Sequence, residues 1–254
     1  MKIIAIGCMA GALALSSAAL ADRTADEHAL AHAVIQNQVA VVQTLLGRGV
    51  SAKAAPALGK EDQWFVQNPE QDPAPPLIVL AASFGAPDSP ILKMLLSKGA
   101  NPNAADRQGN TPLMKAAELG WTPSIDPLLD KAAKVNAKRR DGATALMLAQ
   151  GNLNLGAVAR LIDKGADVNA RDASGLTPLH YAIQRAQHNP IHLYGQKDRP
   201  DEDAARYLEL IQFLIDKGAN VNARDAQGDT PLQLALRLHR TDAANLLRKA
   251  GAHE

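Results

Sequence analysis

Apolar and polar residues alternate in short blocks along this chain, and residues 161–182 show the pattern in full. An apolar block that begins with Leu161 is followed by Gly165, then by a polar run, and then by a second apolar block opened by Thr177 and Pro178. A glycine directly after an apolar helical block favours the left-handed backbone that ends a helix. Threonine caps a helix start, and proline fits the first helical position. The stretch therefore predicts a helix end, a tight turn and the start of the next helix.

The same arrangement recurs along the chain at a fixed period. The capping threonines are separated by 33 residues, and the last one follows after 53, which is one period plus an insert of 20. A fixed period of this size indicates a stack of similar units, each of which buries its apolar side on its neighbours. The helix starts are Thr111, Thr144, Thr177 and Thr230, and the corresponding helix ends are Gly99, Ala132, Gly165 and Gly218.

The repeated motif resembles the ankyrin repeat. It combines Thr-Pro-Leu-His-x-Ala at 177–182 with Lys-Gly-Ala at 164–166 and Val-Asn-Ala-Arg-Asp at 168–172. The resemblance extends over residues 25–254. It implies an all-α solenoid of about six helix-turn-helix repeats joined by β-hairpin-like finger turns. It also implies protein recognition without catalysis, but it identifies no partner, because repeat scaffolds serve unrelated partners.

The N-terminal residues 1–21 are predicted to be a cleavable secretory signal peptide. Lys2 precedes an apolar run, and a small-residue cleavage motif ends at Ala21. An uncleaved membrane anchor is the alternative, which the short apolar run disfavours. We therefore expect a periplasmic or secreted domain, residues 22–254, that has no contact with a membrane after cleavage.

Charge and cysteine content narrow the classes of function. The formal net charge is +1 and Lys2 is the only charged residue of the first 21, so the remaining chain is neutral. A neutral chain does not suggest bulk attraction to nucleic acid or anionic lipid. Cys8 is the only cysteine, so the mature chain would lack disulfides, thiol catalysis and zinc–cysteine sites.

Two predicted inserts, at about 55–75 and 187–206, interrupt the period. The first contains Trp64 and Phe65, which we interpret either as a binding anchor or as a plug on the first repeat. The second contains histidines and a tyrosine that an alternative function, as a ligand-binding protein, metal-binding protein or enzyme, would use. These residues are His188, His192 and Tyr194.

The predicted binding surface is a concave face lined by the finger tips and the first helix of each repeat. Leu148 and Tyr181 are expected to be exposed side by side at its centre, although packing against neighbouring repeats is the alternative. The predicted partner-binding residues are Trp64, Phe65, Arg107, Lys115, Arg139, Arg140, Leu148, Leu176, Tyr181 and Leu234.

A basic patch and a histidine pair each have two interpretations. The basic residues near two fingers would either attract an acidic partner or form a solvated polar face; they are Arg107, Lys134, Lys138, Arg139 and Arg140. His188 and His192 have the spacing of a helical metal pair, but Pro190 disfavours that helix. We predict no metal and no cofactor, and we assign His180 a structural hydrogen bond.

The sequence contains none of the common nucleophile, phosphate-binding or zinc-protease motifs. Most acids recur at the same place in each repeat, where turns and helix ends explain them. We therefore expect a monomeric, non-catalytic scaffold that binds another protein and no nucleic acid. A narrower hypothesis is an inhibitor or an immunity protein that protects or blocks a periplasmic enzyme.

Overall fold

A computed structural model describes residues 24–53, 74–152, 154–185 and 200–253 of the chain. The chain divides into two compact units, Met1–Asn101 and Pro102–Glu254. The predicted signal peptide and the first insert, with Trp64 and Phe65, lie outside the described residues, as does most of the second insert.

The first unit consists of short antiparallel helices. A helix over residues 24–35 precedes α2 (Val39–Gly47), and α3 (Leu77–Phe84) and α4 (Pro90–Ser97) follow the first insert. The α4 helix packs against both α2 and α3. Its start is explained by its sequence, because the Ser89 side chain accepts a hydrogen bond from the backbone of Leu92 at 3.1 Å and Pro90 takes the first helical position.

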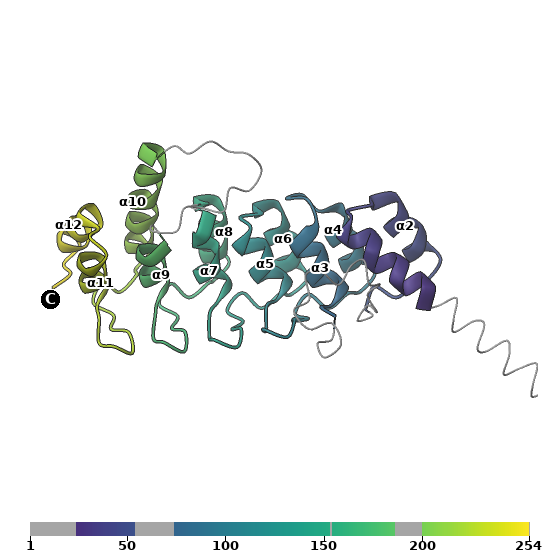
Figure 1. Cartoon of the computed structure of the whole chain (residues 1–254), viewed down its shortest axis with the longest axis horizontal. Helices are drawn as coiled ribbons and strands as arrows, with labels where there is room; N and C mark the ends of the chain where they lie inside the picture. Colours follow the sequence, from purple (N-terminus) through teal and green to yellow (C-terminus); the bar gives the residue numbers. More distant parts are fainter. Residues whose placement is uncertain (1–23, 54–73, 153, 186–199, 254) are drawn as a thin grey trace, which may run out of the picture. The chain divides into compact units, whose positions relative to one another are not determined.

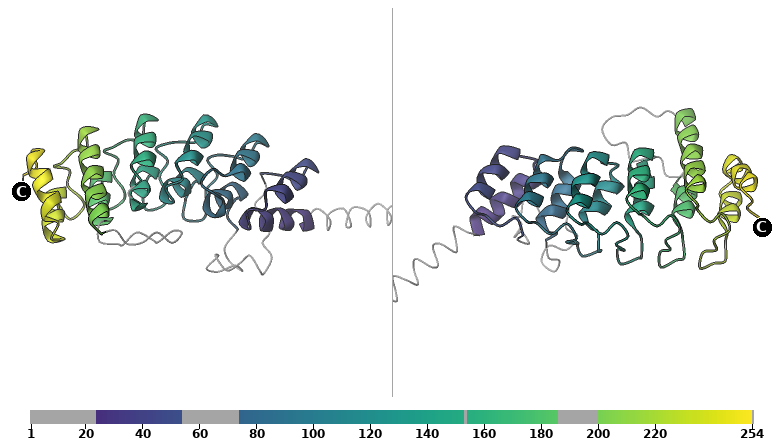
Figure 2. Two further views of the ribbon diagram at one scale, coloured as in Figure 1. Left: turned by 90° about the horizontal axis from the view of Figure 1, so that it is seen from above. Right: turned by 180° about the vertical axis from the view of Figure 1, so that it is seen from behind.

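The second unit stacks helix pairs in two rows (Figures 1 and 2). The inner row packs α5 against α7, α7 against α9 and α9 against α11, and the outer row lies behind it. The inner helices are α5 (Pro112–Glu118), α7 (Ala145–Leu148, continued by the 3-10 turn η2, Ala149–Asn152), α9 (Pro178–Arg185) and α11 (Pro231–Arg237). The outer helices are α6 (Thr122–Asp130), α8 (Leu155–Asp163), α10 (Pro200–Asp216) and α12 (Thr241–Lys249).

The helices start and end where the sequence predicts, although the buried Thr144 hydroxyl has no hydrogen-bond partner among the described residues and does not cap α7. Thr111 accepts a hydrogen bond from the backbone of Met114 at 3.3 Å, and Thr230 accepts one from Gln233 at 3.2 Å. The residues that follow α4, α6, α8 and α10 have positive φ at every predicted position: Gly99 83°, Ala132 64°, Gly165 89° and Gly218 90°. Only Ala132 bears the steric cost of this conformation, since the others are glycines.

Finger turns join the repeats and form a stack of their own. Each finger donates one backbone hydrogen bond to the finger before it: Arg140 N to Gln108 O at 3.0 Å, Ala173 N to Asp141 O at 2.8 Å and Ala226 N to Ser174 O at 2.8 Å. Among the described residues the only β-type pairing outside helices is an isolated antiparallel bridge between Lys138 and Thr144. The predicted all-α solenoid with hairpin-like fingers is therefore the observed architecture.

A ladder of asparagines also connects neighbouring repeats. The Asn136 side chain donates to Gly165 O at 2.9 Å and accepts from Asp167 N at 2.8 Å, so one amide caps the end of the next outer helix. Asn169 repeats the arrangement with Gly218 and Asn220. Asn103 and Asn222 form the first and last rungs.

The second insert changes one outer helix. The α10 helix has 17 residues, whereas α8 has 9, and its first turns extend beyond the neighbouring helices of its unit (Figure 1). Residues 200–206 of the predicted insert are therefore helical. No helix in the described part of the chain is long and apolar enough to cross a membrane.

Candidate functional site

We call the surface made by the finger turns of the second unit and by α5, α7, α9 and α11 the inner face. One row of equivalent finger positions, Asp106, Arg139, Asp172 and Asp225, shows how it is built. The aspartates turn back onto their own fingers. Asp172 Oδ1 accepts from the backbone of Ser174 and of Leu176, both at 2.8 Å. The row therefore carries carboxylates that stabilise turns, except at Arg139.

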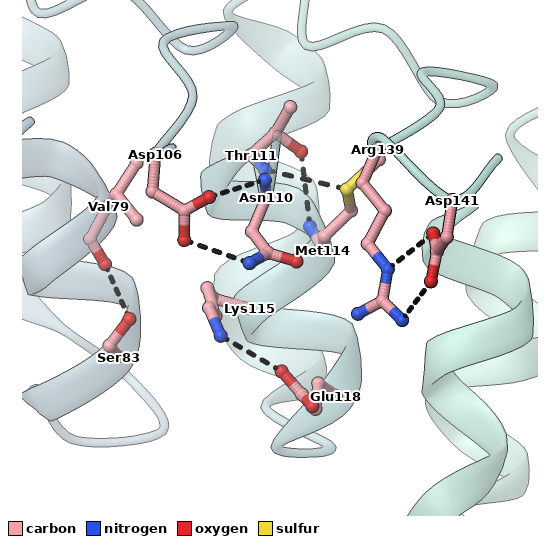
Figure 3. A network of polar contacts seen from close by, with 10 residues as sticks. All are labelled: Val79, Ser83, Asp106, Asn110, Thr111, Met114, Lys115, Glu118, Arg139 and Asp141. Carbon is pink, nitrogen blue, oxygen red and sulfur yellow. Dashed lines mark hydrogen bonds and ion pairs between the residues drawn. The ribbon is translucent and has the colours of Figure 1, made fainter. Parts of the chain in front are cut away.

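Arg139 forms a bidentate ion pair with Asp141 within its own finger (Figure 3). Its Nε donates to Asp141 Oδ1 at 2.7 Å, and its Nη2 donates to Asp141 Oδ2 at 2.6 Å. Asp141 Oδ1 also accepts from Ala143 N at 3.0 Å, so Asp141 performs the turn-stabilising role of the missing aspartate. The hydrogen bond between the two side chains raises the pKa of Arg139 and lowers the pKa of Asp141. Arg139 is therefore a fixed cation.

Tyr181 on α9 is the second fixed group. Its hydroxyl donates to Asp172 Oδ2 at 2.9 Å, and the residue is partly exposed. Burial, and then this hydrogen bond, raise the pKa of Tyr181, so the phenol stays neutral. Arg139 and Tyr181 lie close enough for each to influence the other's pKa. The inner face therefore holds a guanidinium and a phenol within electrostatic reach of each other.

Further charges lie on α5, next to this pair. Lys115 Nζ donates to Glu118 Oε2 at 3.2 Å, as Figure 3 shows. Glu118 also raises the pKa of Arg139, which places it within electrostatic reach of the guanidinium. The centre of the inner face thus combines paired charges of both signs with Tyr181, an arrangement suited to polar recognition.

The predicted exposure of Leu148 and Leu234 is wrong. Leu148 is 1% exposed and Leu234 is 2% exposed, so both belong to the core. Leu148 ends the four-residue α7, which packs between α5 and α9. The close stacking of the inner helices covers both leucines, and the alternative interpretation that was open for Leu148, packing against neighbouring repeats, holds for it. Neither side chain contributes to the surface.

The remaining predicted residues in the described part of the chain lie at or near the surface. Arg107 and Arg140 are exposed at adjacent finger tips. Leu176 and Lys115 are partly exposed on the inner face. The structure therefore gathers Arg139, Tyr181 and Lys115 into one region and places the tip arginines at its edge.

His180 has the structural role predicted for it. It is fully buried. Its Nδ1 accepts from Thr177 N at 3.2 Å, which leaves the proton on Nε2, 3.3 Å from the carbonyl oxygen of Asp229 in the next finger. Burial lowers the pKa of His180, so the neutral ring that this geometry requires is also the favoured form. The histidine ties two fingers together across the second insert.

The sequence did not predict the side-chain pairings of the site, in which Asp141 binds Arg139, Asp172 binds Tyr181 and Glu118 binds Lys115. One signal was available: the period places Arg139 where the other fingers have aspartate. A cation at a turn-stabilising position requires another acid in the same finger, and Asp141 is the nearest one. The hydrogen bond from Tyr181 to Asp172 had no such signal, because it joins a finger to a helix.

The described residues contain no group of three or more histidine, cysteine or acidic side chains placed to hold a metal ion. His188, His192 and Tyr194, on which the alternative function depends, lie outside the described residues.

Comparisons with known families give matches over most of the chain. A family model described as ankyrin repeats (3 copies) matches residues 30–139, 78–172 and 124–193. A second, described as ankyrin repeats (many copies), matches residues 204–248. A search of curated proteins finds no match.

Proposed function

The chain belongs to the ankyrin-repeat family, and on that premise we propose that a protein partner docks on the inner face around Arg139 and Tyr181. The family generally serves as a protein–protein interaction scaffold without catalysis. The observation that carries the proposal is the fixed Arg139–Asp141 pair, at the one finger position in the row where an arginine replaces aspartate and within electrostatic reach of Tyr181.

The remaining hydrogen-bonding capacity of this pair supports the proposal. A guanidinium has five N–H donors, and Asp141 engages one on Nε and one on Nη2, so about three remain for a partner. The Tyr181 hydroxyl is used as a donor, but its oxygen can still accept, and its ring adds apolar area. Both side chains are already ordered, so docking costs less conformational entropy than it would for mobile side chains. Arginine and tyrosine are also the residue types that most often dominate binding energy.

The finer proposal is that the scaffold works outside the cytoplasm as an inhibitor or protective protein for a periplasmic enzyme, and that it is a monomer. The signal-like residues 1–21 and the lack of cysteine after Cys8 support export. Sequencing the N-terminus of the protein from the exported fraction tests this part. A mature N-terminus at Asp22 is expected, and an intact Met1 in that fraction would contradict it.

The docking proposal is tested with the exported protein as bait in a periplasmic extract of its own source, followed by mass spectrometry of what is retained. We expect one stoichiometric protein. Arg139→Lys keeps the charge but loses the planar fork, so the affinity for that protein should fall by on the order of tenfold or more.

The matched control is Arg160→Lys, because Arg160 pairs with Asp126 between two outer helices, away from the inner face. Its affinity should equal that of the unaltered chain. Equal affinities for the Arg139→Lys and Arg160→Lys variants would refute the inner face as the docking surface.

A further inference from the structure

Three exposed cations form a second feature of the fingers, separate from the Arg139 site. Lys138, Arg171 and Arg224 occupy equivalent positions in three successive fingers. Each donates a side-chain hydrogen bond to a backbone carbonyl: Lys138 Nζ to Arg171 O at 2.8 Å, Arg171 Nη2 to Arg224 O at 2.6 Å and Arg224 Nη1 to Gly228 O at 2.8 Å. We call these three residues the cation row.

The charges of the cation row are not neutralised by the described residues. No ion pair among the described side chains includes Lys138, Arg171 or Arg224. The nearby finger acids are engaged elsewhere, since Asp172 binds the Tyr181 hydroxyl and Asp225, 8% exposed, accepts two backbone hydrogen bonds. Carbonyl partners position the cations but leave their positive charge available to a ligand.

The row is continuous in space although the sequence interrupts it. Arg171 and Arg224 are 53 residues apart, yet the side chain of one reaches the backbone of the other. The preceding equivalent position is Ala105, so the row begins at Lys138. Lys138 and Arg171 each reach the next finger, whereas Arg224 bonds within its own finger, so the order of the three positions follows the stacking of the repeats.

The spacing of the row selects the shape of a ligand. Packed helices lie about 8–10 Å apart, so the equivalent finger positions 138, 171 and 224 are expected to recur at about that distance. A polyproline II segment rises about 3.1 Å per residue with three residues per turn, so every third side chain lies on one side about 9.3 Å from the last. We propose that the cation row binds an extended acidic segment of a protein, with a carboxylate at every third residue. This inference rests on the proposed function only in taking the ligand to be a protein.

The test uses two fluorescent peptides of equal composition and the full chain. One has glutamate at the first, fourth and seventh positions with proline and alanine between them, and the other has the three glutamates adjacent. Fluorescence anisotropy at low salt should show the spaced peptide binding on the order of tenfold more tightly, because three exposed ion pairs form together. The difference should shrink at high salt, where exposed charges are screened.

The matching variant replaces the row by Lys138→Gln, Arg171→Gln and Arg224→Gln, which keeps an amide donor at each position. It should lose the preference for the spaced peptide. The control removes the same charge elsewhere, by Lys98→Gln, Lys131→Gln and Lys249→Gln at the exposed ends of α4, α6 and α12, and should keep the preference. The peptide comparison on the unaltered chain decides the matter even if the row variant does not fold.

Equal binding of the spaced and adjacent peptides would overturn the inference. So would equal binding of a single-stranded oligonucleotide with three phosphates, since attraction to any polyanion needs no spacing rule. A captured partner that binds the row variant normally but is lost by Arg139→Lys would refute the cation row and leave the proposed function intact. Preference for the spaced peptide without any captured protein would refute the proposed function instead.

Discussion

The asparagine ladder provides the sharpest test of what connects the repeats. Asn136→Ala removes the bonds to Gly165 O at 2.9 Å and from Asp167 N at 2.8 Å. An intramolecular hydrogen bond contributes about 0.5–1.5 kcal/mol net. Asn136 is exposed, so water can reach both released groups and the lower half of the range applies. We expect a loss of about 1–2 kcal/mol in the free energy of unfolding.

Urea denaturation followed by far-UV circular dichroism measures this loss. For a chain of this size each kcal/mol corresponds to about 2–4 °C in melting temperature. Asn222→Ala should cost less, because its bond to Gly251 O is long, at 3.4 Å, and lies in the last repeat. Asn245→Ala, at an exposed position of α12, is the control and should change stability by less than about 0.5 kcal/mol.

The order of the three variants decides the argument. A loss for Asn136→Ala no larger than that for Asn245→Ala would mean that the ladder is no better than hydration of the same groups. A larger loss for Asn222→Ala than for Asn136→Ala would mean that bond length and position do not govern the cost. Either result would refute the reasoning.

Three further predictions concern stability. Gly142→Ala should lower the free energy of unfolding, measured by urea denaturation, by more than the matched Gly228→Ala. Both glycines have positive φ, so both variants bear backbone strain. A Cβ at Gly142 would also lie 2.7 Å from a backbone nitrogen of the next finger, whereas a Cβ at Gly228 meets nothing within 4 Å. Leu148→Ala should cost about 2–5 kcal/mol as a core truncation, whereas Leu236→Ala, 38% exposed, should cost far less by the same assay; similar losses would contradict the assignment of Leu148 to the core. Acidification should lower the melting temperature from pH 6.5 downward, because the unfolded state takes up a proton on His180 that the folded state, with its lowered pKa, resists. His180→Gln should flatten this dependence just below pH 6.5, and an unchanged pH profile would contradict it.

On the inner face, the residues that recur with the repeat stabilise the finger turns, and the residue that departs from the repeat, Arg139, changes the surface. Aspartates at equivalent positions stabilise turns, which explains why the acids recur with the repeat. Arg139 departs from the row and needs Asp141 to compensate. Asp141 restores one of the two backbone hydrogen bonds that Asp172 makes in its own finger, so such a departure leaves the turn partly stabilised while it places a new side chain on the surface.

The periodic sequence by itself determined the fold of the described repeats. Capping threonines, helix-ending glycines and the buried histidine all act through contacts within a few residues or at a fixed offset in the next repeat. Such contacts recur with the period, so a single sequence reveals them. The prediction for Ala132 also held, because its place in the period, and not its residue type, decides its backbone.

Only the tertiary structure decided which inner-helix residues form a surface. Leu148 and Tyr181 are equivalent in the repeat, yet one is buried and the other is partly exposed with its hydroxyl bonded to Asp172. Periodicity specifies which way a side chain points, but not how closely the neighbouring helices cover it. The carbonyl partner of Arg171, 53 residues away, likewise depends on how the fingers stack on either side of an insert. Contacts of that kind arise from the packing of the whole unit, which local pattern does not encode.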